Sequence, residues 1–180
     1  MRTVFLDRDG VLNYLVDHDG VKTAPWSVKE FRFIPGARDA VRLLKKAGFT
    51  VVVTTNQPDL YDHALPLKDF VLMQRMVFSW LNVDEIHIGL QRGSYVYKPN
   101  NGSIEIFNKQ HGLDRKNSWL VGDRWKDIVA GSRSKLNTVF IGKNYLTPAE
   151  YIDIIPNVIA DDVLDAAQKI VRIYGDKTIC

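Results

Sequence analysis

The fold is decided by the stretch VFLDRDGVLN, residues 4–13. Its first three residues are apolar and are typical of a buried strand, which we expect to span residues 3–6. Two carboxylates, Asp7 and Asp9, and a glycine, Gly10, follow directly where that strand should end. In α/β proteins, ligands bind beyond the carboxyl ends of the parallel strands. The stretch therefore predicts a first strand and, at its end, a place where polar groups meet a ligand.

The rest of the chain alternates between short apolar runs and helical patterns. Further strands are predicted at residues 49–53, 86–88, 119–121 and 138–141, with a short edge strand near 158–159. Helices are predicted after Pro35-Gly36 as far as Gly48, at residues 67–81, 104–111 and 127–134, and from Asp161 or Asp162 to about residue 173. This alternation predicts an α/β fold, a Rossmann-like three-layer sandwich with a mainly parallel central sheet. We expect residues 1–180 to form a single domain.

Composition disfavours several classes of protein. Apolar residues make up 46% and charged residues 25% of the chain, as in an ordinary soluble domain. The formal net charge of +3 comes from scattered Lys and Arg, without the dense basic run of a nucleic-acid-binding face. A single cysteine, Cys180, rules out an intrachain disulfide and a multi-cysteine zinc site. The first apolar run is too short for a signal peptide, and no stretch approaches the ~20 apolar residues of a membrane helix. We therefore expect a cytoplasmic protein with no membrane partner.

Three further pieces of sequence carry chemistry: TTNQ at residues 54–57, KP at 98–99 and GDRWKD at 122–127. Taken singly, each has an ordinary explanation, as a polar strand end, an exposed loop lysine or a helix cap. Together with the first stretch, however, they all fall at one edge of the predicted sheet, where parallel strands bring their carboxyl ends together. The four pieces predict one phosphate-handling active site.

The pair of carboxylates after the first strand indicates covalent phosphoryl transfer. Asp7 is the candidate nucleophile, because a carboxylate that attacks phosphorus forms an acyl phosphate. Asp9 is the candidate acid/base, which would give a proton to the leaving oxygen and then take one from the attacking water. That task requires Asp9 to be protonated and Asp7 to be ionised at the start. Gly10 would let the backbone turn close to the phosphate.

The other pieces supply hydrogen bonds and charge. Thr55 and Asn56 can donate to phosphate oxygens, and Lys98 can offset the charge of the nucleophile and the phosphate. Asp123 is a candidate ligand of Mg²⁺, which prefers hard oxygen ligands, while Asp127 would orient the cluster or hold Lys98. If a helix has begun by Asp123, the four-residue spacing places the two aspartates on one helix face.

These motifs resemble those of the haloacid dehalogenase superfamily of aspartate-nucleophile phosphatases, over essentially the whole chain. The first family motif is matched by DRDG at residues 7–10, and the second by TN at 55–56. The third is matched by Lys98, and the fourth by GD at 122–123 with Asp127.

The resemblance implies an active-site inventory. It implies that Asp7 is the nucleophile and Asp9 the acid/base. It implies a set of phosphate ligands: Thr55, Asn56 and Lys98. It also implies a Mg²⁺ ion held by Asp7, the backbone carbonyl of Asp9 and Asp123.

Longer matches indicate one branch of the superfamily. FLDRDG at 5–10, FRFIPG at 31–36 and TNQ at 55–57 resemble the histidinol-phosphate and heptose-bisphosphate phosphatases. That branch has little or no cap domain and takes small, extended phosphorylated substrates. No segment of this chain is long enough for a large cap, so we expect none.

The chain departs from that branch in three places. Residues 89–97 replace the Cys/His loop that binds zinc in many relatives, so we expect no zinc. Tyr97 stands where relatives often have an arginine, and residues 58–63 replace a segment that carries another. The candidates to grip the rest of the substrate in their place are Arg124, Arg92 and Lys22.

The expected function is a Mg²⁺-dependent phosphomonoesterase that forms an aspartyl-phosphate. Its substrate would be a small phosphorylated metabolite, in particular a sugar phosphate such as a heptose (bis)phosphate. A polynucleotide 3′-phosphatase is an alternative that would need a basic track and stacking aromatics, for which the candidates are Trp26, Tyr61 and Tyr95. A non-catalytic, ligand-binding member of the fold is a second alternative, which the complete set of acids disfavours. The sequence leaves open the sugar, the phosphate removed and the oligomeric state.

Overall fold

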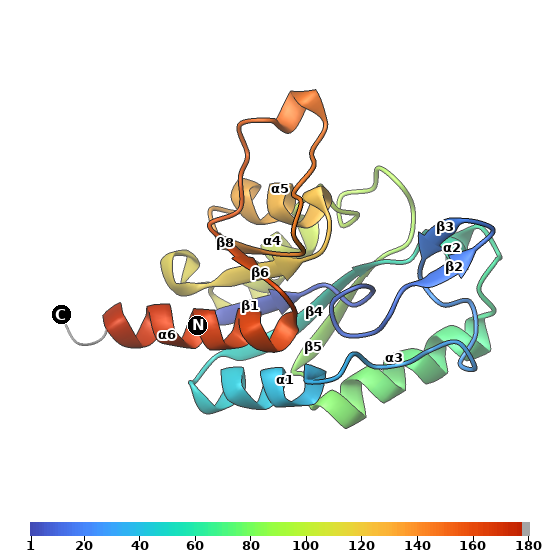
Figure 1. The fold of residues 1–180 in the computed structure, drawn as a ribbon, viewed down its shortest axis with the longest axis horizontal. Coiled ribbons are helices and arrows are strands. Elements are labelled where there is room, and N and C mark those ends of the chain that lie inside the picture. The colour runs from blue at the N-terminus through green and yellow to red at the C-terminus, as the bar shows by residue number, and fades with distance from the viewer. Residues whose placement is uncertain (178–180) are drawn as a thin grey trace.

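The computed structural model describes residues 1–177, and the side chains as far as residue 175, so Cys180 lies outside the described residues (Figure 1). Its centre is a six-stranded sheet in the order β5-β4-β1-β6-β7-β8. All five strand pairings are parallel. The strands are β1 (Thr3–Leu6), β4 (Thr50–Asn56), β5 (Glu85–Gly89), β6 (Trp119–Gly122), β7 (Asn137–Ile141) and β8 (Val158–Ala160).

Helices cover both faces of this sheet, which gives the molecule three layers (Figure 1). One face packs against α1 (Ala37–Lys46), α3 (Leu67–Leu81) and α6 (Val163–Lys177), and the other against α4 (Gly102–His111) and α5 (Trp125–Arg133). A hydrophobic core lies on each face of the sheet, and successive residues of β1 point into the two cores alternately, because side chains alternate along a strand. Val4 and Leu6 belong to the core under α1, whereas Phe5 belongs to the core under α4. The predicted α/β sandwich is confirmed.

The predicted helices and strands correspond to the observed ones, with shifts at several of their ends. β4 runs on through Asn56, three residues beyond the predicted end. α6 extends to Lys177, and Asp162 caps it, because its Oδ1 accepts the main-chain N–H groups of Leu164 and Asp165. α5 begins at Trp125, two residues before its predicted start and two residues after Asp123, so the condition for placing Asp123 and Asp127 on one helix face is not met.

The structure contains short segments that the sequence did not predict, several of them beyond the carboxyl ends of the strands. β2 (Val16–His18) and β3 (Val21–Thr23) form an antiparallel hairpin, and α2 (Pro58–Tyr61) is a single turn of helix. Figure 1 shows the hairpin and α2 side by side, and Thr23 Oγ1 lies 3.4 Å from Asp59 Oδ2. Two 3₁₀ turns, Arg115–Asn117 and Ala149–Tyr151, complete the described elements. None of these additions in residues 1–177 amounts to a large cap domain, as expected.

The register of the central strands decides where the site lies. Leu6, the last residue of β1, is paired with Val53 of β4 on one side and Val121 of β6 on the other. The chain therefore leaves β1 between the polar ends of its two neighbours, and the next residue, Asp7, still donates its N–H to Val121 O at 2.9 Å. A parallel sheet binds ligands at such a point, where successive connections leave to opposite sides. In residues 1–177, no helix combines the length and apolar character required to cross a membrane.

Candidate active site

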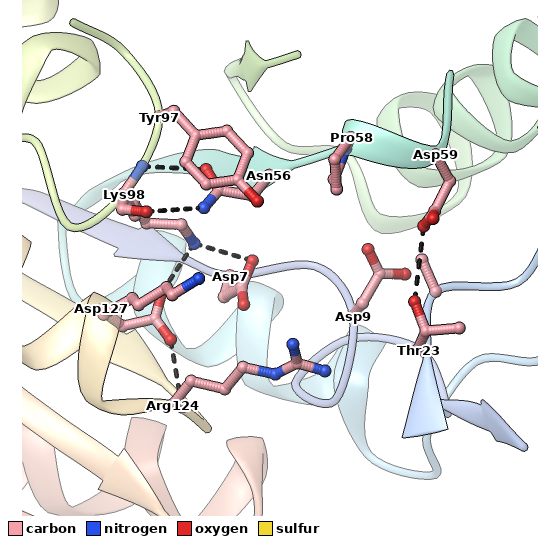
Figure 2. Close-up of a pocket in the computed structure, with 12 residues that line it drawn as sticks. Asp7, Asp9, Thr23, Asn56, Pro58, Asp59, Tyr97, Lys98, Arg124 and Asp127 are labelled. Atoms are coloured by element: carbon pink, nitrogen blue, oxygen red, sulfur yellow. Dashed lines mark hydrogen bonds and ion pairs between the residues drawn. The ribbon is translucent and has the colours of Figure 1, made fainter. Parts of the chain in front are cut away.

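A small cavity of about 80 Å³ opens at this edge of the sheet (Figure 2). Residues from all four sequence pieces line it: Asp7, Asp9, Asn56, Lys98, Arg124, Lys126 and Asp127. The hairpin and α2 contribute the remaining wall with Thr23, Ala24, Pro58 and Asp59, together with Tyr97. A water molecule occupies about 30 Å³ in the liquid, so the cavity suits a group of a few heavy atoms.

Lys98 joins two of the predicted carboxylates (Figure 2). Its Nζ lies 2.9 Å from Asp7 Oδ1 and 2.6 Å from Asp127 Oδ1, and it donates to Thr54 O at 2.8 Å. The main-chain N–H of Arg8 also donates to Asp7 Oδ1, at 2.7 Å. Among the described residues, Asp7 Oδ2 accepts no hydrogen bond, which leaves this oxygen free to act on a ligand.

Burial and charge shift the protonation of this pair in opposite ways. Burial raises the pKa of Asp7 to about 6, because the offset from Lys98 is smaller and Asp127 adds to the rise. Burial alone would lower the pKa of Lys98, but the carboxylates of Asp127 and Asp7 outweigh it, so the pKa is raised. Lys98 is therefore charged at neutral pH, while Asp7, even beside Lys98, holds its proton more readily than a free aspartate.

The start of α5 gives Asp127 its orientation. Asp127 lies in the first turn, where its Oδ2 accepts the main-chain N–H of Arg124 at 3.1 Å and so caps the helix. Its other oxygen is thereby directed at Lys98. Gly122 leaves the necessary space, because a Cβ at that position would collide with the Asp127 side chain. Asp123 precedes α5, so the two aspartates do not share a helix face, yet their carboxylate oxygens lie within 4.8 Å of each other.

Asp123 completes a cluster that fits a divalent cation. Carboxylate oxygens of Asp7, Asp123 and Asp127 all lie within 4.8 Å of one another. Among the described residues, Asp123 Oδ1 is shielded from solvent and has no hydrogen-bond partner. Burial, with added repulsion from Asp7 and Asp127, raises the pKa of Asp123 to about 8. Three hard oxygen donors with unbalanced negative charge are the set that Mg²⁺ accepts.

Gly10 is required next to this cluster. Its φ is +88°, a conformation that residues with a Cβ adopt only under strain, and a Cβ there would collide with the carboxylate of Asp123. The predicted close turn at Gly10 thus makes room for the Asp123 side chain.

Asp9 lines the cavity but its carboxylate lies apart from the cluster, on the side away from Lys98 (Figure 2). Its oxygens accept hydrogen bonds from Arg8, Asn13 and Gln57, and Thr55 Oγ1 lies 3.4 Å away. The third carboxylate of the cluster comes from Asp127 and not from Asp9. The predicted binding of Mg²⁺ by the backbone carbonyl of Asp9 stays a prediction. Burial favours the proton on Asp7 in the metal-free site, and the expected division of charge between Asp7 and Asp9 stays a prediction.

The two predicted phosphate donors from β4 are already engaged. Asn56 Nδ2 donates to Lys98 O at 2.9 Å, and Asn56 Oδ1 accepts the N–H of Lys98, also at 2.9 Å. Thr55 Oγ1 accepts a hydrogen bond from Gln57 Nε2 at 2.9 Å and is turned toward Asp9. Asn56 thus fixes the main chain of Lys98, and direct phosphate binding by Thr55 and Asn56 stays a prediction.

The predicted basic groups lie in three different places. Arg124 is exposed, lines the small cavity and donates from Nη2 to Lys22 O at 3.3 Å. Lys22 itself lines a separate, larger cavity of about 590 Å³, which also borders Gly10 and Asp123. Arg92 is exposed and forms an ion pair with Asp62, on the segment that follows α2.

Three further candidate functional residues were not predicted from the sequence. Lys126 lines the cavity, and its pKa is lowered by burial and by the nearby Arg124 and Arg92. Arg8 and Gln57 are buried beside Asp9. All three lie within the quoted motifs, so their position next to predicted site residues was the available signal.

Comparison with known proteins agrees with this geometry. A family model described as HAD-hydrolase-like, where HAD stands for haloacid dehalogenase, matches residues 96–166. A D-glycero-β-D-manno-heptose-1,7-bisphosphate 7-phosphatase of Haemophilus influenzae is 30% identical over 190 residues, which cover 96% of each chain. The chain belongs to the haloacid dehalogenase-like phosphatases.

Other members of this family give the same picture. The phosphatase of the same name from Pasteurella multocida is 32% identical over 156 residues, or 78% of this chain and 81% of the relative. The crystal structure of a D,D-heptose 1,7-bisphosphate phosphatase from B. bronchiseptica has the same fold, with a TM-score of 0.79 and 23% identity. That match covers 96% of this chain and 99% of the other, and the neighbour was crystallised with magnesium and phosphate. The predicted membership of the haloacid dehalogenase phosphatases is confirmed.

Proposed function

We propose that this phosphatase is a Mg²⁺-dependent phosphomonoesterase that transfers the phosphoryl group of a sugar phosphate to Asp7 and then to water. One observation carries the proposal: Lys98 Nζ binds both Asp7 and Asp127, while Asp123 lies within 4.8 Å of the same carboxylates. A carboxylate cluster, a fixed positive charge and a free carboxylate oxygen thus meet between the small cavity, which Asp7 and Asp127 line, and the larger cavity, which Asp123 lines.

The chain's own residues account for each bond that forms or breaks. Asp7 Oδ2 attacks phosphorus, an aspartyl-phosphate bond forms, and the bond from phosphorus to the sugar oxygen breaks. Asp9 gives a proton to that leaving oxygen. In the second half, a water attacks the phosphorus and gives a proton to Asp9, which releases phosphate and restores the Asp7 carboxylate. Lys98 balances the negative charge at Asp7 throughout.

Mg²⁺ would be held by Asp7 and Asp123, with Asp127 close enough to orient them and the Asp9 carbonyl as the expected further ligand. When bound, it supplies positive charge that offsets the repulsion between phosphate and carboxylates. The B. bronchiseptica neighbour, which shares the fold, holds magnesium and phosphate together. We propose that no zinc is needed, because residues 89–97 contain no cysteine.

The proposed substrate is a heptose bisphosphate or a sugar phosphate of similar length. Curated relatives of this chain are named for heptose 1,7-bisphosphate. Arg124 and Lys126 line the mouth of the cavity, and Arg92 raises the positive charge around them. A second phosphate on an extended sugar would meet these cations while the first occupies the cavity beside Asp7. The sugar would extend from this open cavity past the hairpin and α2, which form part of its wall.

A panel of phosphorylated metabolites tests the proposal. Phosphate release from heptose 1,7-bisphosphate should require Mg²⁺ and should exceed release from histidinol phosphate. Asp7→Asn keeps the shape of the side chain but removes the nucleophile, so kcat should fall by at least about 10³-fold with the protein still folded. Turnover of Asp7→Asn near the rate of the unmodified protein would contradict the covalent route. If the protein hydrolyses another phosphomonoester but no sugar phosphate, the proposed substrate class would be wrong and the proposed reaction would stand.

A further inference from the structure

Arg8 has the largest fully buried side chain among the described residues, and the reaction proposed above gives it no role. A guanidinium is rarely buried without a partner, because removing its charge from water is costly. The partner here is the carboxylate of the next residue, Asp9. Arg8 Nη2 lies 2.9 Å from Asp9 Oδ1 and 3.0 Å from Oδ2, and Nε lies 3.2 Å from each oxygen.

Gln57 closes a ring around this pair. Its Nε2 donates to Asp9 Oδ2 at 2.5 Å, and its Oε1 accepts from Arg8 Nη2 at 2.9 Å. Asn13 Nδ2 donates to the other oxygen, Asp9 Oδ1, at 2.9 Å. The far end of the Arg8 guanidinium is held by Gln74 Oε1, 3.3 Å from Nη1. Both oxygens of the Asp9 carboxylate therefore accept hydrogen bonds from neighbouring side chains, and Asp9 still lines the cavity.

We propose that Arg8, with Gln57, is a positioning residue that sets where the Asp9 carboxyl faces the leaving oxygen of the substrate. This inference rests on the proposed function, because it takes Asp9 as the acid/base. Two side-chain torsions of Asp9 are otherwise free to rotate, and a small misplacement of a reacting group is enough to lose much of its effect. The fork of Arg8 fixes both oxygens, which a lysine at the same place could not do.

The nature of the leaving group separates positioning from mere structural support. A sugar alkoxide leaves slowly unless Asp9 supplies a proton, whereas p-nitrophenolate leaves without one. The value of kcat/KM reports the steps up to phosphoryl transfer to Asp7. Misplacing Asp9 should therefore lower kcat/KM for the sugar phosphate much more than for p-nitrophenyl phosphate. A variant that only loses stability should lower both values in the same proportion.

The experiment compares kcat/KM for heptose 1,7-bisphosphate and p-nitrophenyl phosphate in the full chain with Mg²⁺. Asp9→Asn is the reference variant. It should lower kcat/KM about 10²–10⁴-fold for the sugar phosphate, and the loss for the aryl phosphate should be at least about tenfold smaller. Arg8→Lys should cost about tenfold or more on the sugar phosphate and less than about threefold on the aryl phosphate. Gln57→Met should also lower kcat/KM more for the sugar phosphate than for the aryl phosphate. This variant keeps the ion pair of Arg8 and Asp9, so it tests the positioning role even if Arg8→Lys does not fold.

The matched control is Arg115→Lys. Arg115 also binds a carboxylate through two nitrogens, from Nη1 to Glu105 Oε1 at 3.1 Å and from Nη2 to Oε2 at 2.7 Å, and neither residue lines the small cavity. This variant should leave both kcat/KM values unchanged within about twofold.

Each outcome has a defined meaning. An unchanged ratio for Arg8→Lys and Gln57→Met, with a changed ratio for Asp9→Asn, would overturn the positioning role and leave the proposed function in place. An unchanged ratio for Asp9→Asn would remove the acid role from the proposed function, and the positioning role with it.

Discussion

Asp7, Asp123 and Asp127 bring three carboxylates together, and Lys98 binds only two of them. Asp123 is left with a shielded oxygen that no described residue satisfies. At the scale of single residues, the site therefore lacks one positive charge at a defined place. A group whose pKa is raised by burial and by like charges opposes folding when it is forced to ionise.

Replacing Asp123 should expose this imbalance. Asp123→Asn should weaken Mg²⁺ binding at least about tenfold, because it removes a charged ligand. In EDTA, the same variant should be more stable than the unmodified protein by about 1 kcal/mol, or roughly 2–4 °C in Tm for a chain of this size. Calorimetric titration with Mg²⁺ and thermal unfolding in EDTA give the two values. A metal-free variant that melts below the unmodified protein would show that Asp123 stabilises the fold without a cation.

The pH dependence of stability follows from the same shifts. The pKa is raised to about 6 for Asp7 and to about 8 for Asp123, against about 3.9 in an unfolded chain. Between pH 4 and pH 8 the folded protein binds more protons than the unfolded chain, so the metal-free stability should fall as the pH rises through this window. Urea unfolding in EDTA at several pH values measures this fall, and saturating Mg²⁺ should reduce it. A metal-free stability that rises from pH 5 to pH 8 would contradict the raised pKa values.

Single residues also mark how far the sequence could predict the site. Asp7, Lys98, Asp123 and Asp127 were predicted, and the structure brings them together. Asp7 and Asp123 directly follow strands, Asp127 lies in the first turn of α5, and Lys98 lies in the loop before α4. Arg8 was not given a role, because an arginine between two aspartates at a strand end has the pattern of a solvated charge. Only the structure shows that its side chain is fully buried, with the guanidinium over the ring of Phe31 and bonded to Gln74 of α3.

At the scale of elements, the N-terminus of α5 links helix stability to the site. Asp127 uses one oxygen to cap α5 and the other to hold Lys98. A helix cap contributes about 1 kcal/mol, and loss of one partner from a buried ion pair costs about 3–5 kcal/mol.

The two contributions can be separated by two substitutions. Asp127→Asn keeps a side-chain oxygen for the cap, whereas Asp127→Ala removes both contacts. We expect Asp127→Ala to be the less stable of the two by about 1 kcal/mol in urea unfolding, with Mg²⁺ absent. Both should lower kcat, because Lys98 loses a carboxylate that orients it. Equal stability of the two variants would show that Asp127 does not act as a cap.

Elements with a strong periodic pattern were predicted closely, and short polar ones were not. α3 has the predicted bounds, because apolar residues recur along it at helical spacing and Leu81 ends the pattern. β4 continues past the predicted end because Thr54, Thr55 and Asn56 are polar yet remain paired with β5. The hairpin of β2 and β3 has three residues per strand and no apolar alternation, so only its packing over the site defines it.

At the scale of the whole molecule, the distribution of charge bears on the choice of substrate. The net charge is +3, and the cations near the site, Arg124, Lys126 and Arg92, lie around one small mouth. We propose that the chain acts as one domain on small metabolites, because a polynucleotide needs a continuous basic track.

An oligonucleotide with a 3′-phosphate tests this choice. Its kcat/KM should be at least about 100-fold below that of heptose 1,7-bisphosphate, and its binding should depend little on salt, because few phosphates are neutralised. Kinetics at two salt concentrations provide the measurement. Efficient removal of the 3′-phosphate, with affinity that falls steeply as salt is added, would favour a nucleic-acid substrate.

The central claim is that Asp7 carries the phosphoryl group during turnover. The most direct measurement is acid quenching during steady-state hydrolysis of heptose 1,7-bisphosphate with Mg²⁺, followed by peptide mass spectrometry. We predict the mass of one phosphoryl group on the peptide that contains Asp7, and none on that peptide in Asp7→Asn. A phosphoryl group found on a different residue, with Asp7 unmodified at every quench time, would contradict the account.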